Sequence, residues 1–320
     1  MNLKRTLATL AIAAGLGTTP IRGQEILHSP HQGSDFYQST PRGYLALGNV
    51  ALNSALAGVG ALINKKPVLP ALKNGALGGL MQYAAKDIAG RNLALSWPAK
   101  AINAVGTAIT TNAARGKPSL SDIGMDIGPI YLRLTQESGR TTFRPYLLPD
   151  ALLTTTIAIA SGDHFELEKS LVAGTPIFRT SKPWFNAIGN GVTSVVRYDR
   201  GLQRSDWDRT TCRTHNGIEN ICRVYYDIGH ENTFTKHENI HALQYASSRT
   251  FTALLGTQYD VLERTSNKTG LWLLNGAGTV MQWTPTLALP YKSRPWEIEA
   301  EGLATHRENI RVLETRKNPI

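Results

Sequence analysis

The chain has 320 residues, 42% of them hydrophobic, which is enough apolar material for one large domain or for two to three modest ones. Its formal net charge is +10, but the basic residues are scattered and form no run with interleaved aromatic residues. Nucleic acid is therefore not an expected partner, whereas a mildly basic surface is compatible with anionic lipid or an acidic cell-wall polymer.

The amino terminus has the pattern of a secretory signal peptide, which we assign to residues 1–23. Lys4 and Arg5 precede an apolar run, Thr6–Gly17, which is too short to span a bilayer comfortably. Gly23 provides a small residue at the expected cleavage point. We therefore expect export to the periplasm or the cell envelope, and an uncleaved membrane anchor is the alternative.

The next region, residues 24–125, is rich in Gly and Ala and predicts two or three helices. Small residues recur at close helical spacing, which lets helix backbones approach each other as membrane helices often do. Polar residues interrupt the apolar faces, so a tightly packed soluble hairpin and membrane association through residues 44–115 both stay open. The expected helices are Tyr44–Ile63, Ala71–Ala89 and Trp97–Arg115.

Residues 126–232 switch to runs that are typical of strands, separated by Gly and Pro. Side chains from Ile130 to Thr135 alternate between apolar and polar, and a turn is expected at Glu137–Arg140. We expect a central, mostly antiparallel sheet in this region. The other expected strand segments are Leu152–Ala160, Phe165–Phe178 and Val192–Tyr198.

Two cysteines lie in a polar loop of the same region. Nine residues separate Cys212 from Cys222, and in an oxidising compartment such a pair would close a small loop through a disulfide. A metal site made with His215 is the alternative, but the spacing matches no familiar zinc pattern.

The last region, residues 233–320, contains an H-E-x-x-H motif. On a helix, His237 and His241 lie on one face and can direct two imidazole nitrogens at a single metal ion. Glu238 is then placed to accept a proton from a water in the open coordination position. The alternative is that Thr235 and Glu238 form a capping box at the start of the helix.

A site of this kind needs a third protein ligand, and three carboxylates near the carboxyl end of the chain offer one. Glu297 and Glu301 are four residues apart and share a helix face, while Glu299 points roughly the other way. One carboxylate of the pair can bind the metal while the other supports a ligand histidine. Alternatively, these acidic residues only favour a helix start through the macrodipole.

The two motifs together resemble those of the gluzincin metallopeptidases, in particular the CAAX prenyl endopeptidases and the bacterial membrane heat-shock endopeptidases. The resemblance covers residues 233–310. It implies one Zn²⁺ with His237, His241 and Glu297 as ligands, Glu238 as the general base and Glu301 as a supporting acid, where those families usually have Asp. The H-E-x-x-H-x-x-Q form, which ends at Gln244, is also similar to uncharacterised bacterial secreted proteins with expected peptidase domains.

Together these features predict an α+β protein, and the resemblance implies a zincin-like fold in which C-terminal helices carry the metal site. The expected function is hydrolysis of a peptide or protein substrate by a zinc metallopeptidase. The alternative is a membrane-associated or non-catalytic interaction protein with a degenerate or structural zinc site.

Overall fold

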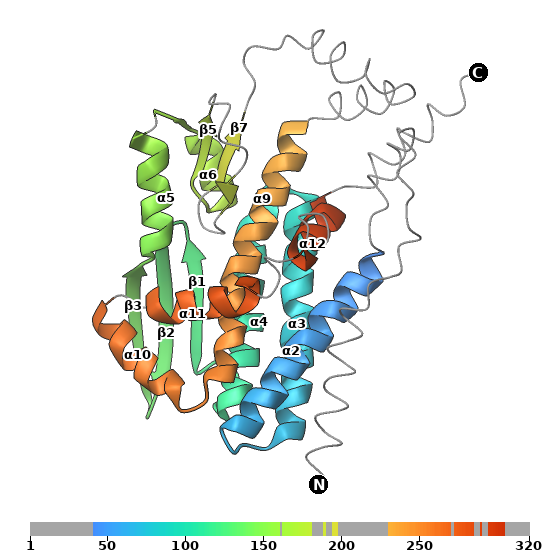
Figure 1. Ribbon diagram of the computed structural model, residues 1–320, viewed down its shortest axis with the longest axis vertical. Coiled ribbons are helices and arrows are strands. Elements are labelled where there is room, and N and C mark those ends of the chain that lie inside the picture. The colour runs from blue at the N-terminus through green and yellow to red at the C-terminus, as the bar shows by residue number, and fades with distance from the viewer. Residues whose placement is uncertain are drawn as a thin grey trace, which may run out of the picture.

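The computed structural model of the chain describes residues 41–160, 162–180, 188–189, 194–197, 230–269, 272–284, 289 and 294–304. The fold is α+β and mostly helical, with two small sheets (Figure 1). The signal-peptide assignment and the expected pair Cys212 and Cys222 lie outside the described residues.

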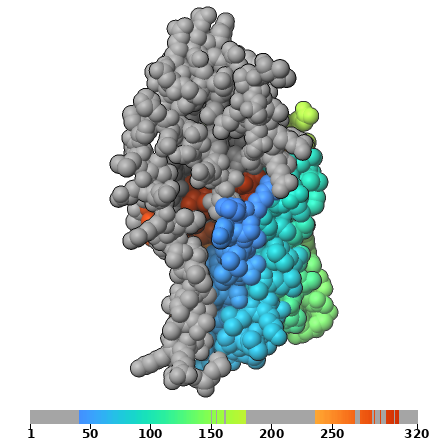
Figure 2. All heavy atoms as spheres, turned by 90° about the vertical axis from the view of Figure 1, so that its right-hand side faces the viewer, coloured from blue at the N-terminus to red at the C-terminus, as the bar shows by residue number. Residues whose placement is uncertain are grey.

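The Gly/Ala-rich region forms three long helices, as expected, and in the structure these helices pack on one another. Lys65, with a φ of 54°, makes the turn between the first two, and Gly116, with a φ of 66°, ends the third. In Figure 2 the first two lie side by side along one face of the molecule. The helices are α2 (Arg42–Ile63), α3 (Val68–Arg91) and α4 (Ser96–Arg115).

Glycines allow these helix backbones to touch. A Cβ on Gly78 would lie 2.5 Å from the carbonyl oxygen of Gly106, and a Cβ on Gly79 would clash with the carbonyl oxygen of Asn49. Two amide side chains also join α2 to α3, where the Asn53 Nδ2 donates to Gln82 Oε1 at 3.0 Å. Close backbone contacts and buried amides thus hold the three helices together as one helical frame.

The first sheet is antiparallel and has the strand order β1-β2-β3. The expected turn at Glu137–Arg140 is present, with positive φ at Ser138 and Gly139. One face of the sheet packs on α4 and on the C-terminal helices, where Tyr131 joins a core cluster with Tyr245 and Tyr259. The strands are β1 (Asp122–Ile127), β2 (Ile130–Glu137) and β3 (Arg140–Leu147).

The expectation of one central sheet is wrong in two places. The Thr/Ile-rich run Leu152–Ala160 lies in a helix, where the Thr155 and Thr156 hydroxyls donate to carbonyl oxygens four residues earlier. The segment Phe165–Phe178 contains a helix between two short strands, which belong to a second, mixed sheet of order β4-β5-β7-β6. These elements are α5 (Pro149–Ala160), β4 (His164–Phe165), α6 (Leu167–Ala173), β5 (Ile177–Thr180), β6 (Ile188–Gly189) and β7 (Ser194–Arg197).

The C-terminal helices pack against the helical frame, and through Tyr245 and Tyr259 they join the core of the first sheet (Figure 1). The longest of them, α9, contacts α3 and α4, and the short α12 is packed against α9, α3 and α2. In Figure 2 the dark red atoms of α12 lie beside the blue atoms of α2. The elements are α9 (His230–Ser247), η3 (Ser248–Leu255), α10 (Gln258–Thr269), α11 (Trp272–Trp283) and α12 (Pro295–Ala304).

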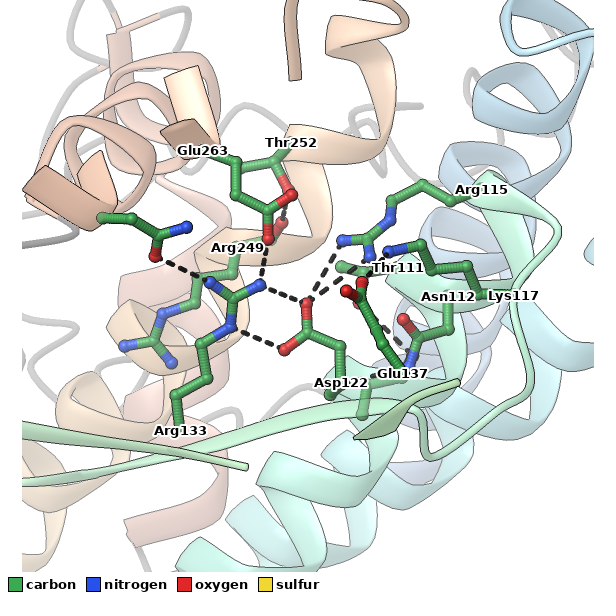
Figure 3. Close-up of polar contacts among 12 residues, drawn as sticks. Thr111, Asn112, Arg115, Lys117, Asp122, Arg133, Glu137, Arg249, Thr252 and Glu263 are labelled. Atoms are coloured by element: carbon green, nitrogen blue, oxygen red, sulfur yellow. Dashed lines mark hydrogen bonds and ion pairs between the residues drawn. The ribbon is translucent and has the colours of Figure 1, made fainter. Parts of the chain in front are cut away.

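A buried ion-pair network ties α4, the first sheet and α10 together (Figure 3). The guanidinium of Arg133 binds the Asp122 carboxylate at 2.6 Å and also contacts Glu263 and, at 3.4 Å, the amide oxygen of Asn267. Arg115, from the end of α4, reaches the same Asp122 carboxylate at 3.4 Å. The sheet is therefore fixed to the helices by charged groups as well as by its core.

Candidate metal centre

The two histidines of the H-E-x-x-H motif lie one turn apart on α9 and face the same point. Their Nε2 atoms are 3.0 Å apart, and their rings meet edge to face with centroids 4.6 Å apart. This arrangement follows from the helix itself, because residues four positions apart lie on one face. Two imidazole lone pairs can therefore be directed at one ion.

Glu297, in the first turn of α12, provides a third donor atom at the same point. Its Oε2 lies 3.4 Å from His237 Nε2 and 3.3 Å from His241 Nε2. Donor atoms bound tetrahedrally to zinc are about 3.3 Å apart, given the usual zinc–nitrogen and zinc–oxygen distances. The separations between these three atoms therefore fit a zinc ion.

The donor set is buried unevenly. The side chains of His241 and Glu297 are 7% and 8% exposed, whereas that of His237 is 14% exposed. His237 is therefore the most exposed of the three candidate ligands.

Glu238 lies close enough to all three candidate ligands for their charges to shift the pKa of its carboxyl. Its side chain is buried, and its Oε2 forms no hydrogen bond to any described residue. Burial raises the pKa of the Glu238 carboxyl, and the negative charge of Glu297 adds to the rise, while the two histidines oppose it. A carboxylate in such surroundings accepts a proton more readily than one in water.

The capping interpretation of Glu238 is wrong. Helix α9 begins at His230, so Thr235 lies inside the helix and not at its N-cap.

The pKa of His241 is raised. Burial alone would lower this pKa, but the hydrogen bond to Glu297 and the charges of Glu238 and Glu297 outweigh the effect of burial.

Gln244, three residues after His241, contacts the ring on the side away from Glu297. Its Oε1 lies 2.7 Å from His241 Nδ1. The Gln244 Nε2 donates to the carbonyl oxygen of Trp296 at 2.9 Å and to Glu299 Oε2 at 2.8 Å. The amide therefore joins a candidate ligand on α9 to the backbone and a carboxylate of α12.

Helix spacing places Glu299 roughly opposite Glu297, yet its carboxylate takes part in the contacts that support the centre. It is buried because α12 is covered on both sides, by α9 and by the pair α2 and α3. On the second side it accepts from Lys86 Nζ at 2.7 Å and from Asn49 Nδ2 at 2.5 Å. Burial raises the pKa of Glu299, but the charge and hydrogen bond of Lys86 outweigh this and lower it.

The structure thus brings His237, Glu238, His241 and Glu297 together, while the side chain of Glu301 lies outside what is described. Sequence reasoning missed the roles of Gln244, Glu299 and their partners. The sequence signals for Gln244 were its position three residues after His241, on the same helix face, and the H-E-x-x-H-x-x-Q form that it completes. Comparisons with protein-family models, with curated proteins and with solved structures gave no match for this chain.

Proposed function

We propose that this chain is an exported zinc-dependent peptidase with a zincin-like arrangement of its catalytic helices. The observation that carries the proposal is the convergence of three donor atoms of the types zinc prefers, beside a buried glutamate with a free oxygen. Peptides or proteins are the proposed substrates.

Each residue has a separate role in this proposal. His237, His241 and Glu297 would hold the ion, which when bound lowers the pKa of a water and polarises a substrate carbonyl. Glu238 takes the proton that the attacking water gives up and passes it to the leaving amine. We place the approach of the substrate on the side of His237, the most exposed of the three candidate ligands.

A purely structural zinc is less well supported. Structural sites are closed by four protein ligands, whereas catalytic sites have three and keep the fourth position for water. Within the described ranges, the group that can hold an ion contains three donors, His237, His241 and Glu297.

The proposal is tested by comparing the parent with Glu238→Gln on a library of proteome-derived peptides read by mass spectrometry. The parent should generate new termini, and the variant should bind zinc equally but cleave at least about 10²-fold more slowly. A variant that cleaves as fast as the parent would exclude Glu238 as the base. A zinc-loaded parent that cleaves nothing would contradict the peptidase assignment.

A membrane-associated interaction protein is the second candidate, because one described helix is long and apolar enough to cross a bilayer. That helix is α2, with a mean hydropathy of 1.6 over an 18-residue window of which 33% is buried. Carbonate extraction of expressing cells separates the two candidates. Retention of the chain in the membrane pellet would favour the second, and release would favour a soluble exported enzyme.

A further inference from the structure

The side-chain amide of Gln244 fits its surroundings in one orientation. The Nε2 atom lies between two acceptors, the Trp296 carbonyl oxygen at 2.9 Å and Glu299 Oε2 at 2.8 Å. A rotated amide would put its oxygen against both of these oxygens, with no hydrogen between them. The Gln244 Oε1 must therefore face His241.

This orientation determines the tautomer of His241. An amide oxygen only accepts hydrogen bonds, so the Nδ1 atom of His241, 2.7 Å away, must carry the proton. A neutral imidazole has one N–H group, and the lone pair is then on Nε2. That is the atom that lies 3.0 Å from His237 Nε2 and 3.3 Å from Glu297 Oε2.

The Glu299 carboxylate is itself held by residues of the helical frame. Lys86, from α3, donates to it at 2.7 Å, and Asn49, from α2, donates at 2.5 Å. Lys86 also donates to Asn49 Oδ1 at 2.6 Å, so the three side chains form a closed group. The Lys86 and Glu299 side chains are 4% and 11% exposed. Each buried charge is therefore compensated by the other, and removing one would leave the other without its partner.

We propose that Gln244 is a positioning residue for His241, and that Glu299, held by Lys86 and Asn49, fixes the orientation of Gln244. The inference rests on the proposed metal site and adds residues of α2 and α3 to it. These helices then affect metal affinity without contacting the ion. Loss of such supporting contacts typically weakens metal binding about 10–100-fold.

The test is zinc affinity, measured by competition with a chromophoric chelator, together with the absorption spectrum of the Co²⁺-substituted protein. Gln244→Leu removes the contact to His241 while leaving every ion pair intact, and Glu299→Gln removes the charge that orients the amide. Asp122→Asn is the matched control, because it breaks a buried ion pair outside the site. We expect about 10–100-fold weaker zinc binding and a changed Co²⁺ spectrum in the first two variants only.

Two results would overturn the inference. One is parent-like zinc affinity and Co²⁺ spectrum in Gln244→Leu, which stays informative even where Glu299→Gln does not fold. The other is equal weakening in Asp122→Asn, since loss of stability alone would then account for the effect. A parent that binds zinc but cleaves no peptide would contradict the proposed peptidase and leave this inference intact, whereas a parent that binds no zinc would exclude both.

Discussion

Glu297 and Glu299 stand two residues apart on α12 and have different surroundings. Glu297 faces the two histidines of α9, with its Oε2 3.3 Å from His241 Nε2. Glu299 faces α2 and α3, where Lys86 compensates its charge. Two neighbouring carboxylates thus have separate tasks, one as a candidate ligand and one as a support for Gln244.

At this scale we predict that Glu297→Gln weakens zinc binding by more than the roughly 10–100-fold expected for the loss of a supporting contact. The glutamine side chain carries no negative charge to bind the ion, and because it has the shape of glutamate it preserves the packing of α12. Isothermal titration of the metal-free protein with zinc measures the change. Affinity equal to that of the parent would remove Glu297 from the ligand set.

The supporting role of Glu301 stays a prediction, which Glu301→Gln tests in the same titration.

The motif residues could be predicted from sequence because their geometry is local. The spacing of His237, Glu238 and His241 defines one helix face whatever surrounds the helix. The role of Glu299 could not be predicted, since it depends on α12 being covered on both sides. Helix spacing placed Glu299 opposite Glu297 correctly, but it could not show that Lys86 and Asn49 lie there.

Among the elements, the contact between α3 and α12 connects the helical frame to the candidate metal centre. Gly90, near the end of α3, lies against the backbone of α12, and a Cβ there would clash with the carbonyl oxygen of Leu303. Glu297 and Glu299 are on that same helix, so its distance from α3 sets where both carboxylates lie.

We therefore predict that Gly90→Ala both destabilises the fold and weakens zinc binding. Overpacking of this kind costs about 1–3 kcal/mol, and α12 must shift to relieve it. The matched control is Gly48→Ala on α2, where nothing lies within 4 Å of the added Cβ. It should be neutral or stabilise the helix by up to about 1 kcal/mol. Urea unfolding and zinc titration measure the two effects, and parent-like values for Gly90→Ala would contradict the contact.

Helix periodicity predicted α2, α3 and α4 because each is long, and the glycines between them mark close approach. The same reasoning failed for Leu152–Ala160, where Thr and Ile suggested a strand. In the structure Pro149 begins α5, a position that proline tolerates well, and threonine hydroxyls donate within the helix. Local propensity was too weak to decide this segment.

Across the whole molecule, buried ion pairs hold the sheet to the helices. Burial alone would raise the pKa of the Asp122 carboxyl, but the hydrogen bond and charge of Arg133, with the charge of Arg115, lower it instead. A carboxyl whose pKa is lower in the folded state stabilises the fold above its unfolded pKa, about 3.9. That contribution is lost as the pH falls through the folded pKa.

We predict that the parent loses stability as the pH falls below about 4, and that Asp122→Asn loses less over that range. Near pH 7 the variant should be less stable by up to about 3–5 kcal/mol, because Arg133 keeps only Glu263 as a carboxylate partner and Arg115 loses its ion pair. Urea unfolding across this range, with a chelator present so that metal release does not contribute, gives both quantities. Parallel pH profiles for parent and variant would show that Asp122 does not carry the effect.

The central claim is that His237, His241 and Glu297 bind one zinc ion. Elemental analysis of the purified chain from residue 24, beside Glu238→Ala and His241→Ala, tests it most directly. We predict one zinc per chain in the parent and in Glu238→Ala, and almost none in His241→Ala, because Glu238 is not a ligand and His241 is. A folded parent that contains no zinc, even after zinc is supplied during expression, would contradict the account.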